Sequence, residues 1–168
     1  MPFNTLLLTC LHRGTSFSEN GKDIRVDPLP DEIFAFFIID DQSNPKSKVR
    51  EEFGITGEIC DLLVFRALKN NDKKIICLVE LKGNNIDKAI DQVMNTYKFF
   101  GTKVSQMKLK NAKEILDSIT WKAYIRLGGS APVKIKDEKV EQLNRVFKGK
   151  NNFKISRDKN LGNFIRES

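Results

Sequence analysis

The sequence predicts a single α/β domain in which helices flank a mixed central β-sheet. One observation is the alternation along the chain of strand-like and helix-like segments. The other is the length of 168 residues with 40% apolar composition, which suits one core and is too short for two ordinary domains. We therefore treat residues 1–168 as one domain, with a core at about 48–127 and a basic C-terminal part at 128–168.

The first half of the chain predicts a strand, a helical turn and a hairpin. Residues 33–39 form a short apolar run, rich in aromatic and β-branched side chains and bounded by acidic residues, which favours a buried strand. Residues 48–53 predict a helical turn that ends at Gly54. Two strands are expected at 59–68 and 74–82, and the paired asparagines between them favour an antiparallel hairpin.

The second half predicts helices that alternate with strands. The apolar residues after Ile86 recur with a helical period, so a helix is expected from there to Gly101. A second helix is predicted over 104–118, a strand with one buried face over 119–127, a helix over 137–148 and an edge strand over 153–156.

Composition excludes several classes of protein. Three cysteines argue against a disulfide framework, and a single histidine excludes a zinc site built from histidines. No apolar run reaches the roughly 18 residues of a membrane span, and the N-terminal segment lacks the pattern of a signal peptide. We therefore expect no membrane partner and a cytoplasmic location.

The net charge of +7 is distributed unevenly. Residues 1–100 hold 13 basic and 15 acidic residues, whereas residues 101–168 hold 16 basic and 7 acidic residues. An acidic half beside a basic half suits a nucleic-acid enzyme, with carboxylates for a metal and cations for phosphates. A lysine-rich solvated face gives the same count, so charge alone leaves both interpretations open.

Three charged residues stand at the ends of the two apolar hairpin strands: Asp61, Glu80 and Lys82. In a hairpin centred between Asn70 and Asn71, opposed residues have numbers that sum to 141, which places Asp61 across from Glu80. A loop centred one residue later places Asp61 across from Lys82. Both registers bring the three side chains together on one face.

Two converging carboxylates raise each other's pKa unless a cation is present, and hard oxygen ligands suit Mg²⁺. A bound Mg²⁺ lowers the pKa of its water and neutralises charge on a phosphate oxygen, and Lys82 is placed to act on that water. The competing interpretation is a buried ion pair between Lys82 and a carboxylate that only closes the edge of the sheet.

Asp61, an interval of 18 residues, Glu80-Leu81-Lys82 on a second strand, and a following helix with Gln92 together resemble the PD-(D/E)XK phosphodiesterase superfamily, which has the restriction-endonuclease-like fold. The resemblance covers about residues 48–100, with 119–127 as the next core strand. It implies that Asp61, Glu80 and the backbone carbonyl of Leu81 bind Mg²⁺, with Mn²⁺ as a substitute, and that Lys82 acts at the attacking water. Cys60 stands where the family name has proline.

Further candidates surround this motif. Many members of that superfamily add an upstream acidic ligand, for which Glu51, Glu52 and Glu58 are all candidates, with Glu52 and Glu58 retained. Gln92 falls about 120° from Ile86 on an ideal helix, at the flank of the apolar stripe, and is the fourth candidate catalytic residue. The candidates for contacts with nucleic-acid phosphates are Lys122, Arg126, Lys134, Lys136, Arg145, Lys148, Lys150, Lys154 and Arg157.

These observations predict a Mg²⁺-dependent nuclease that hydrolyses phosphodiester bonds, with DNA favoured over RNA and endonuclease activity favoured over exonuclease activity. A homodimer is compatible with this function, since enzymes of this fold often cut two strands with two subunits. The alternative is a module that keeps the nuclease fold and binds nucleic acid or protein without turnover. A third interpretation is an unrelated α/β domain in which the motif is a coincidence.

Overall fold

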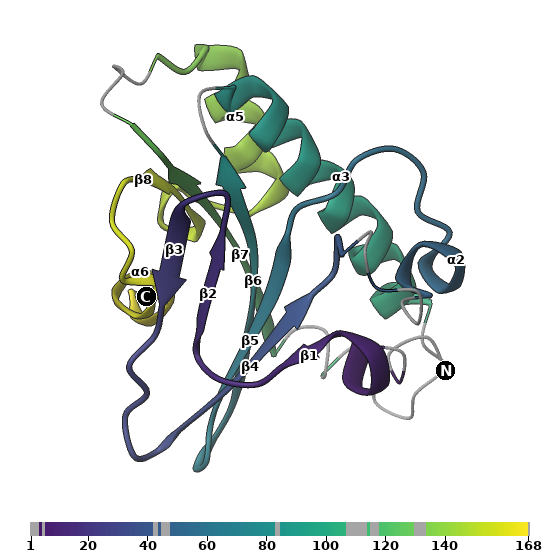
Figure 1. Cartoon of the computed structure of the whole chain (residues 1–168), viewed down its shortest axis with the longest axis vertical. Coiled ribbons are helices and arrows are strands. Elements are labelled where there is room, and N and C mark those ends of the chain that lie inside the picture. Colours follow the sequence, from purple (N-terminus) through teal and green to yellow (C-terminus); the bar gives the residue numbers. More distant parts are fainter. Residues whose placement is uncertain are drawn as a thin grey trace.

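In the computed structural model, the chain forms a six-stranded mixed sheet and a separate two-stranded hairpin (Figure 1). The structure describes residues 4, 6–41, 44, 48–82, 85–106, 114, 118–129 and 134–167. The strands are β1 (Leu11–His12), β2 (Ser16–Glu19), β3 (Lys22–Arg25), β4 (Glu32–Ile38), β5 (Leu62–Leu68), β6 (Asn71–Lys82), β7 (Ile119–Leu127) and β8 (Phe153–Ser156). The helical elements are η1 (Leu6–Cys10), α2 (Val49–Phe53), α3 (Ile86–Ser105), α5 (Asp137–Val146), η2 (Lys150–Asn152) and α6 (Leu161–Arg166).

The sheet combines an antiparallel half with a parallel half. Its strand order is β1-β4-β5-β6-β7-β8, and β2 pairs only with β3. Strands β4, β5 and β6 form an antiparallel meander, and α3 then carries the chain to β7, which lies parallel to β6. β8 adds a second parallel strand at the edge. The predicted α/β class with a mixed sheet is therefore confirmed.

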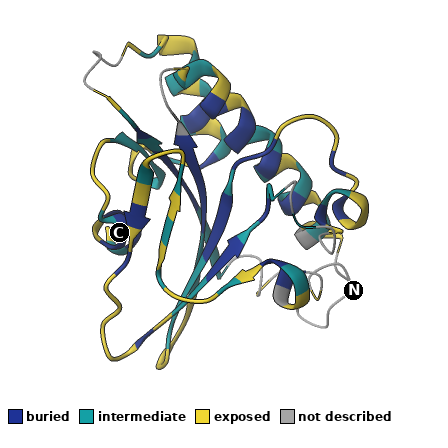
Figure 2. Ribbon diagram, viewed as in Figure 1, coloured by how far each residue is buried: buried dark blue, intermediate teal, exposed yellow. Residues whose placement is uncertain are grey.

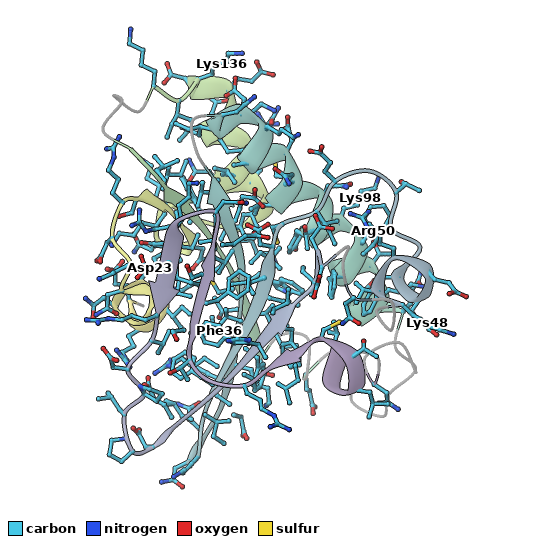
Figure 3. All side chains as sticks on the ribbon, viewed as in Figure 1. Asp23, Phe36, Lys48, Arg50, Lys98 and Lys136 are labelled. Atoms are coloured by element: carbon cyan, nitrogen blue, oxygen red, sulfur yellow. The ribbon has the colours of Figure 1, made fainter. Side chains whose placement is uncertain are left out.

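Both faces of the sheet are covered (Figures 1 and 2). Helices α2, α3 and α5 lie against one face, whereas the β2–β3 hairpin and α6 lie against the other. Successive residues of β5 alternate between the two cores, with Leu63 facing the first and Val64 the second. Phe36, labelled in Figure 3, is fully buried in the second core beside Ile24 of the hairpin.

Of the two registers that the sequence left open, the structure has the one that places Asp61 across from Glu80. Leu62 pairs with Val79 and Arg66 with Ile75, so opposed residues have numbers that sum to 141 along most of the ladder. The register shifts only next to the turn, where Leu68 pairs with Asn71. Both strands start at other residues than predicted. β5 begins at Leu62 instead of residue 59, and β6 begins at Asn71 instead of residue 74.

The prediction that Gly101 ends the central helix is wrong. α3 continues to Ser105, because an isolated glycine weakens a helix without ending it, and Gly101 lies against the ring of Tyr97. Most of the predicted helix over 104–118 lies outside the described residues. The strand over 119–127, the edge strand over 153–156 and the short helix after residue 48 are confirmed, and α5 ends at Val146, two residues before its predicted end.

No helix among the described residues is long and apolar enough to cross a membrane.

Candidate carboxylate site

The carboxylate of Asp61 lies across the end of β6. Asp61 stands one residue before β5, and its Oδ2 accepts a hydrogen bond of 2.6 Å from the backbone N–H of Leu81. Continuing the ladder past the pair Leu62–Val79 brings Asp61 level with Glu80, whose exposed fraction is 1%. The structure therefore brings together the two carboxylates that the sequence pairs.

Burial and neighbouring negative charge both raise the pKa of Asp61. The pKa of Asp61 is raised to about 8, first by burial and then by the negative charge of Glu80, while the Leu81 N–H opposes the shift. Glu19 raises the pKa of Asp61 further through its charge and a side-chain hydrogen bond. An oxygen-lined site with this surplus of negative charge favours the binding of a cation.

Glu19 comes from the β2–β3 hairpin and is the site residue that the sequence analysis missed. Asn20 and Gly21 both have positive φ, at 49° and 71°, and connect Glu19 to Lys22 by a two-residue turn. The tip of the hairpin reaches the end of β7, where the flexible side chain of Lys22 lies over Gly128. The Asn-Gly pair is the sequence signal that could have revealed this hairpin.

Three polar side chains of α3 hold the segment that leads into Asp61. Gln92, with an exposed fraction of 7%, donates from Nε2 to the carbonyl of Ile59 at 3.1 Å. The hydroxyl of Thr96 accepts from the N–H of Cys60 at 2.9 Å, and Asn95 donates to the carbonyls of Thr56 and Glu58. These bonds hold residues 56–60, and the carbonyl of Asp61 itself accepts a hydrogen bond of 2.9 Å from the N–H of Ile39. The contact of Gln92 therefore helps to position Asp61.

A second helix, α2, also holds this segment. Arg50 of α2, labelled in Figure 3, donates to the carbonyl of Gly57 at 2.6 Å and pairs with Asp40 at 2.7 Å. Gly54 ends α2 in the left-handed conformation, as the sequence predicts. The loop between α2 and β5 is therefore held at several points before it reaches Asp61.

The other predicted ligands have different positions. Glu58 is exposed and pairs with Lys88 at 2.7 Å, and Glu51 and Glu52 lie exposed on α2. The acidic residue that interacts with Asp61 besides Glu80 is Glu19. Lys82 ends β6 opposite Leu127, and its side chain lies outside the described residues.

Within the described parts of the chain, no group of three or more His, Cys, Asp or Glu side chains converges as a metal site. The donor chemistry still fits Mg²⁺, because Mg²⁺ is usually held by one or two carboxylates and keeps several waters. Asp61 and Glu80 supply two such oxygen donors. Burial raises the pKa of the thiol of Cys60, which precedes Asp61, and this disfavours thiolate ligation.

The prediction that Lys122 faces solvent is wrong. Its exposed fraction is 2%, because α6 covers the face of β7 that the alternating pattern assigned to solvent. The ammonium donates to the backbone carbonyls of Phe164 and Glu167 and lies 4.8 Å from the centre of the Phe164 ring. Lys122 therefore anchors the C-terminal helix and is withdrawn from the candidate phosphate contacts.

We expect Lys122→Met to lower the free energy of unfolding by about 2 kcal/mol, because hydrogen bonds from a buried ammonium to α6 are lost. Urea denaturation measures this change. Lys134→Met removes the same charge from an exposed site and serves as the control. Equal stability of the two variants would contradict the anchoring role.

The remaining basic candidates lie at the surface with different partners. Arg126 is partly exposed and donates to the carbonyl of Asp23, so it ties β7 to the hairpin. Ion pairs within the chain engage Lys136 with Asp87, Arg145 with Glu141 and Lys154 with Glu167. Arg157 donates to the carbonyl of Gly129, whereas Lys134, Lys148 and Lys150 are exposed.

No family model, curated protein or solved structure matches this chain.

Proposed function

We propose that this protein is a metal-dependent nuclease that hydrolyses phosphodiester bonds, with DNA preferred over RNA. The observation that carries the proposal is the position of Asp61 at the Leu81 N–H, beside the buried carboxylate of Glu80. The meander β4–β5–β6, the crossover through α3 and the parallel β7 support the restriction-endonuclease-like arrangement that the sequence resembles.

In this proposal the residues have separate roles. Asp61 and Glu80 hold Mg²⁺, which when bound supplies an acidified water and neutralises charge on the phosphate. Gln92 and Thr96 hold the segment of Asp61 in place through Ile59 and Cys60. The role of Lys82 at the attacking water stays a prediction from the sequence.

Glu19 lies beside Asp61 on the hairpin, on the opposite side of the sheet from α3, and does not form a converging group of three ligands with Asp61 and Glu80. As a neighbour of Asp61 it increases the attraction of the site for a divalent cation. The exposed lysines of the C-terminal part supply positive charge for the phosphate backbone, which is where the surplus of basic residues lies.

The test is a cleavage assay on supercoiled, linear and single-stranded DNA and on RNA, with Mg²⁺, Mn²⁺ or EDTA. We expect cleavage with either metal and none in EDTA, and loss of cleavage in Glu80→Gln. Glu58→Gln changes an exposed carboxylate that is paired with Lys88 and is expected to stay active.

Cleavage in EDTA, or by Glu80→Gln at the rate of the unchanged protein, would contradict the metal-site assignment. Binding of DNA without cleavage under every condition would support the alternative, a non-catalytic module.

A further inference from the structure

A cavity of about 640 Å³ opens between the second half of α3, the end of α5 and the start of β7. It lies away from the carboxylate site along the sheet. Ile119, at its lining, pairs with Lys74 of β6, and the six residue-to-residue steps from Lys74 to Glu80 span about 20 Å of strand. The cavity has the size of a pocket for a small organic ligand.

Aromatic rings form one side of this cavity. Tyr97 packs edge-on against Trp121, with 5.2 Å between ring centres, and lies 5.3 Å from Phe147. Tyr97 and Trp121 are only partly buried, although both pack against the first core. A partly exposed tyrosine and tryptophan in a concave site offer a flat apolar ligand a surface for stacking.

The polar lining is cationic. Lys98, labelled in Figure 3, and Lys148 both line the cavity, whereas none of the described residues that line it is acidic. Lys148 has a φ of 56°, at the position after a helix end where glycine is usual. Glycine would adopt this backbone conformation without strain, yet the chain has a lysine here and so places an ammonium group at the cavity.

Hydrogen-bond acceptors complete the lining. The amide nitrogen of Asn152 donates to the carbonyl of Phe147 at 2.7 Å, which fixes the side chain and turns its oxygen away from that bond. The hydroxyl of Thr102 donates to the carbonyl of Lys98, so its oxygen remains an acceptor. Acceptors of this kind suit the amino groups of nucleobases.

We propose that this cavity binds a nucleoside phosphate, with the base against Tyr97 and Trp121 and the phosphate at Lys98 and Lys148. The ligand is either a free nucleotide or one nucleotide of a single strand, since both present the same base and phosphate. The site is separate from Asp61 and Glu80 and does not depend on the proposed nuclease activity.

Trp121 is the only tryptophan of the chain, so its fluorescence reports directly on the cavity. We expect adenosine monophosphate to quench it with a saturable binding curve, and adenosine or inorganic phosphate to bind at least about tenfold more weakly, because each makes only part of the contacts. A short single-stranded oligodeoxynucleotide tests whether the ligand is one nucleotide of a single strand. Whichever of the oligodeoxynucleotide and the free nucleotide binds more tightly identifies the ligand of the cavity. Asp61→Asn is expected to bind the nucleotide with unchanged affinity.

Two variants test the contacts without removing the core. Lys148→Gly removes the ammonium and relieves the left-handed backbone, so we expect about tenfold weaker nucleotide binding with an equal or higher Tm. Gly101→Leu fills the cavity from α3, where a Cβ atom meets the Tyr97 ring at an ordinary 3.8 Å, and is expected to abolish quenching. Lys48→Ala, which removes an exposed charge outside the cavity and outside the candidate phosphate contacts, is the control and should bind as the unchanged protein does.

The proposal is overturned if the nucleotide causes no saturable quenching, if Lys148→Gly binds it with the affinity of Lys48→Ala, or if inorganic phosphate binds as tightly as the nucleotide. Retained quenching in folded Gly101→Leu, with circular dichroism like that of the unchanged protein, would also overturn it.

Discussion

Asp61→Asn is expected to lower the rate of metal-dependent cleavage by at least about 100-fold. Even residues that only support metal ligands cost up to about that factor when they are replaced, and Asp61 is assigned as a ligand itself. Asparagine keeps an oxygen that can accept the hydrogen bond of the Leu81 N–H, so the local backbone is preserved. A plasmid cleavage assay at saturating Mg²⁺ measures the effect.

The same substitution is expected to stabilise the metal-free fold at high pH. The pKa of Asp61 rises from an ordinary 3.8 to about 8 in the folded protein, so the protonated carboxyl favours folding below pH 3.8. That contribution is lost as the pH rises through 8, where the ionised carboxylate faces Glu80. In EDTA at pH 9, Asp61→Asn should therefore melt several degrees above the unchanged protein, with the difference disappearing toward pH 4.

Asp72→Asn is the matched control, because Asp72 is an exposed aspartate at the turn end of β6, the strand that pairs with β5. It should leave both cleavage and the pH dependence of Tm unchanged. Cleavage by Asp61→Asn at the rate of this control would remove Asp61 from the proposed mechanism. A lower Tm of Asp61→Asn at pH 9 would contradict the unfavourable charge at the site.

Glu32→Gln is expected to lower the free energy of unfolding by about 3 kcal/mol at pH 7, because one buried carboxylate joins three elements. The side chain of Glu32 in β4 is fully buried and pairs with Arg66 of β5 at 2.8 Å and with Arg166 of α6 at 2.6 Å. The N–H of Leu29 donates to the same carboxylate. Glutamine leaves both guanidinium groups without their counter-charge, and urea denaturation measures the loss.

The pH dependence provides an independent check. The hydrogen bond from Arg166 contributes most to lowering the pKa of Glu32, from 4.5 to about 2. A carboxyl whose pKa is lowered by folding stabilises the protein above pH 4.5, and this contribution is lost as the pH falls through 2. The stability of the unchanged protein should thus approach that of Glu32→Gln near pH 2.

Glu52→Gln is the control for this variant, since Glu52 is exposed on α2. A gap between the unchanged protein and Glu32→Gln that is the same at pH 7 and pH 2 would contradict the ion-pair explanation. The gap would then arise from packing alone.

The central part of the candidate site was predictable because side chains of a strand alternate. A turn centred between Asn70 and Asn71 makes opposed residues sum to 141, which places Asp61 across from Glu80 with both side chains on one face. The order of the strands and of α3 follows from the same local patterns. These features depend on residues that are close in the sequence.

The features that the sequence analysis missed depend on distant contacts. The alternation of Lys122 with Trp121 and Ala123 is typical of a half-exposed strand, and only the packing of α6 makes the lysine internal. Asn20-Gly21 indicates a hairpin, yet nothing in the local pattern brings Glu19 to a residue 42 positions away. The hydrogen bonds from α3 to residues 56–60 also could not be predicted from the local sequence, because amide and hydroxyl side chains on a helix are usually solvated.

The position of the carboxylates has a consequence for how the molecule assembles. The two strands of a hairpin pair first next to the turn, which here is Lys69–Asn70. Asp61 and Glu80 lie at the other end of the hairpin, farthest from this turn. They are therefore the last pair of this hairpin to meet during folding and the first to separate when it frays. Hydrogen bonds from α3, from Arg50 and from the N–H of Ile39 hold this end of the hairpin, so the order of the site depends on elements before and after the hairpin in the chain.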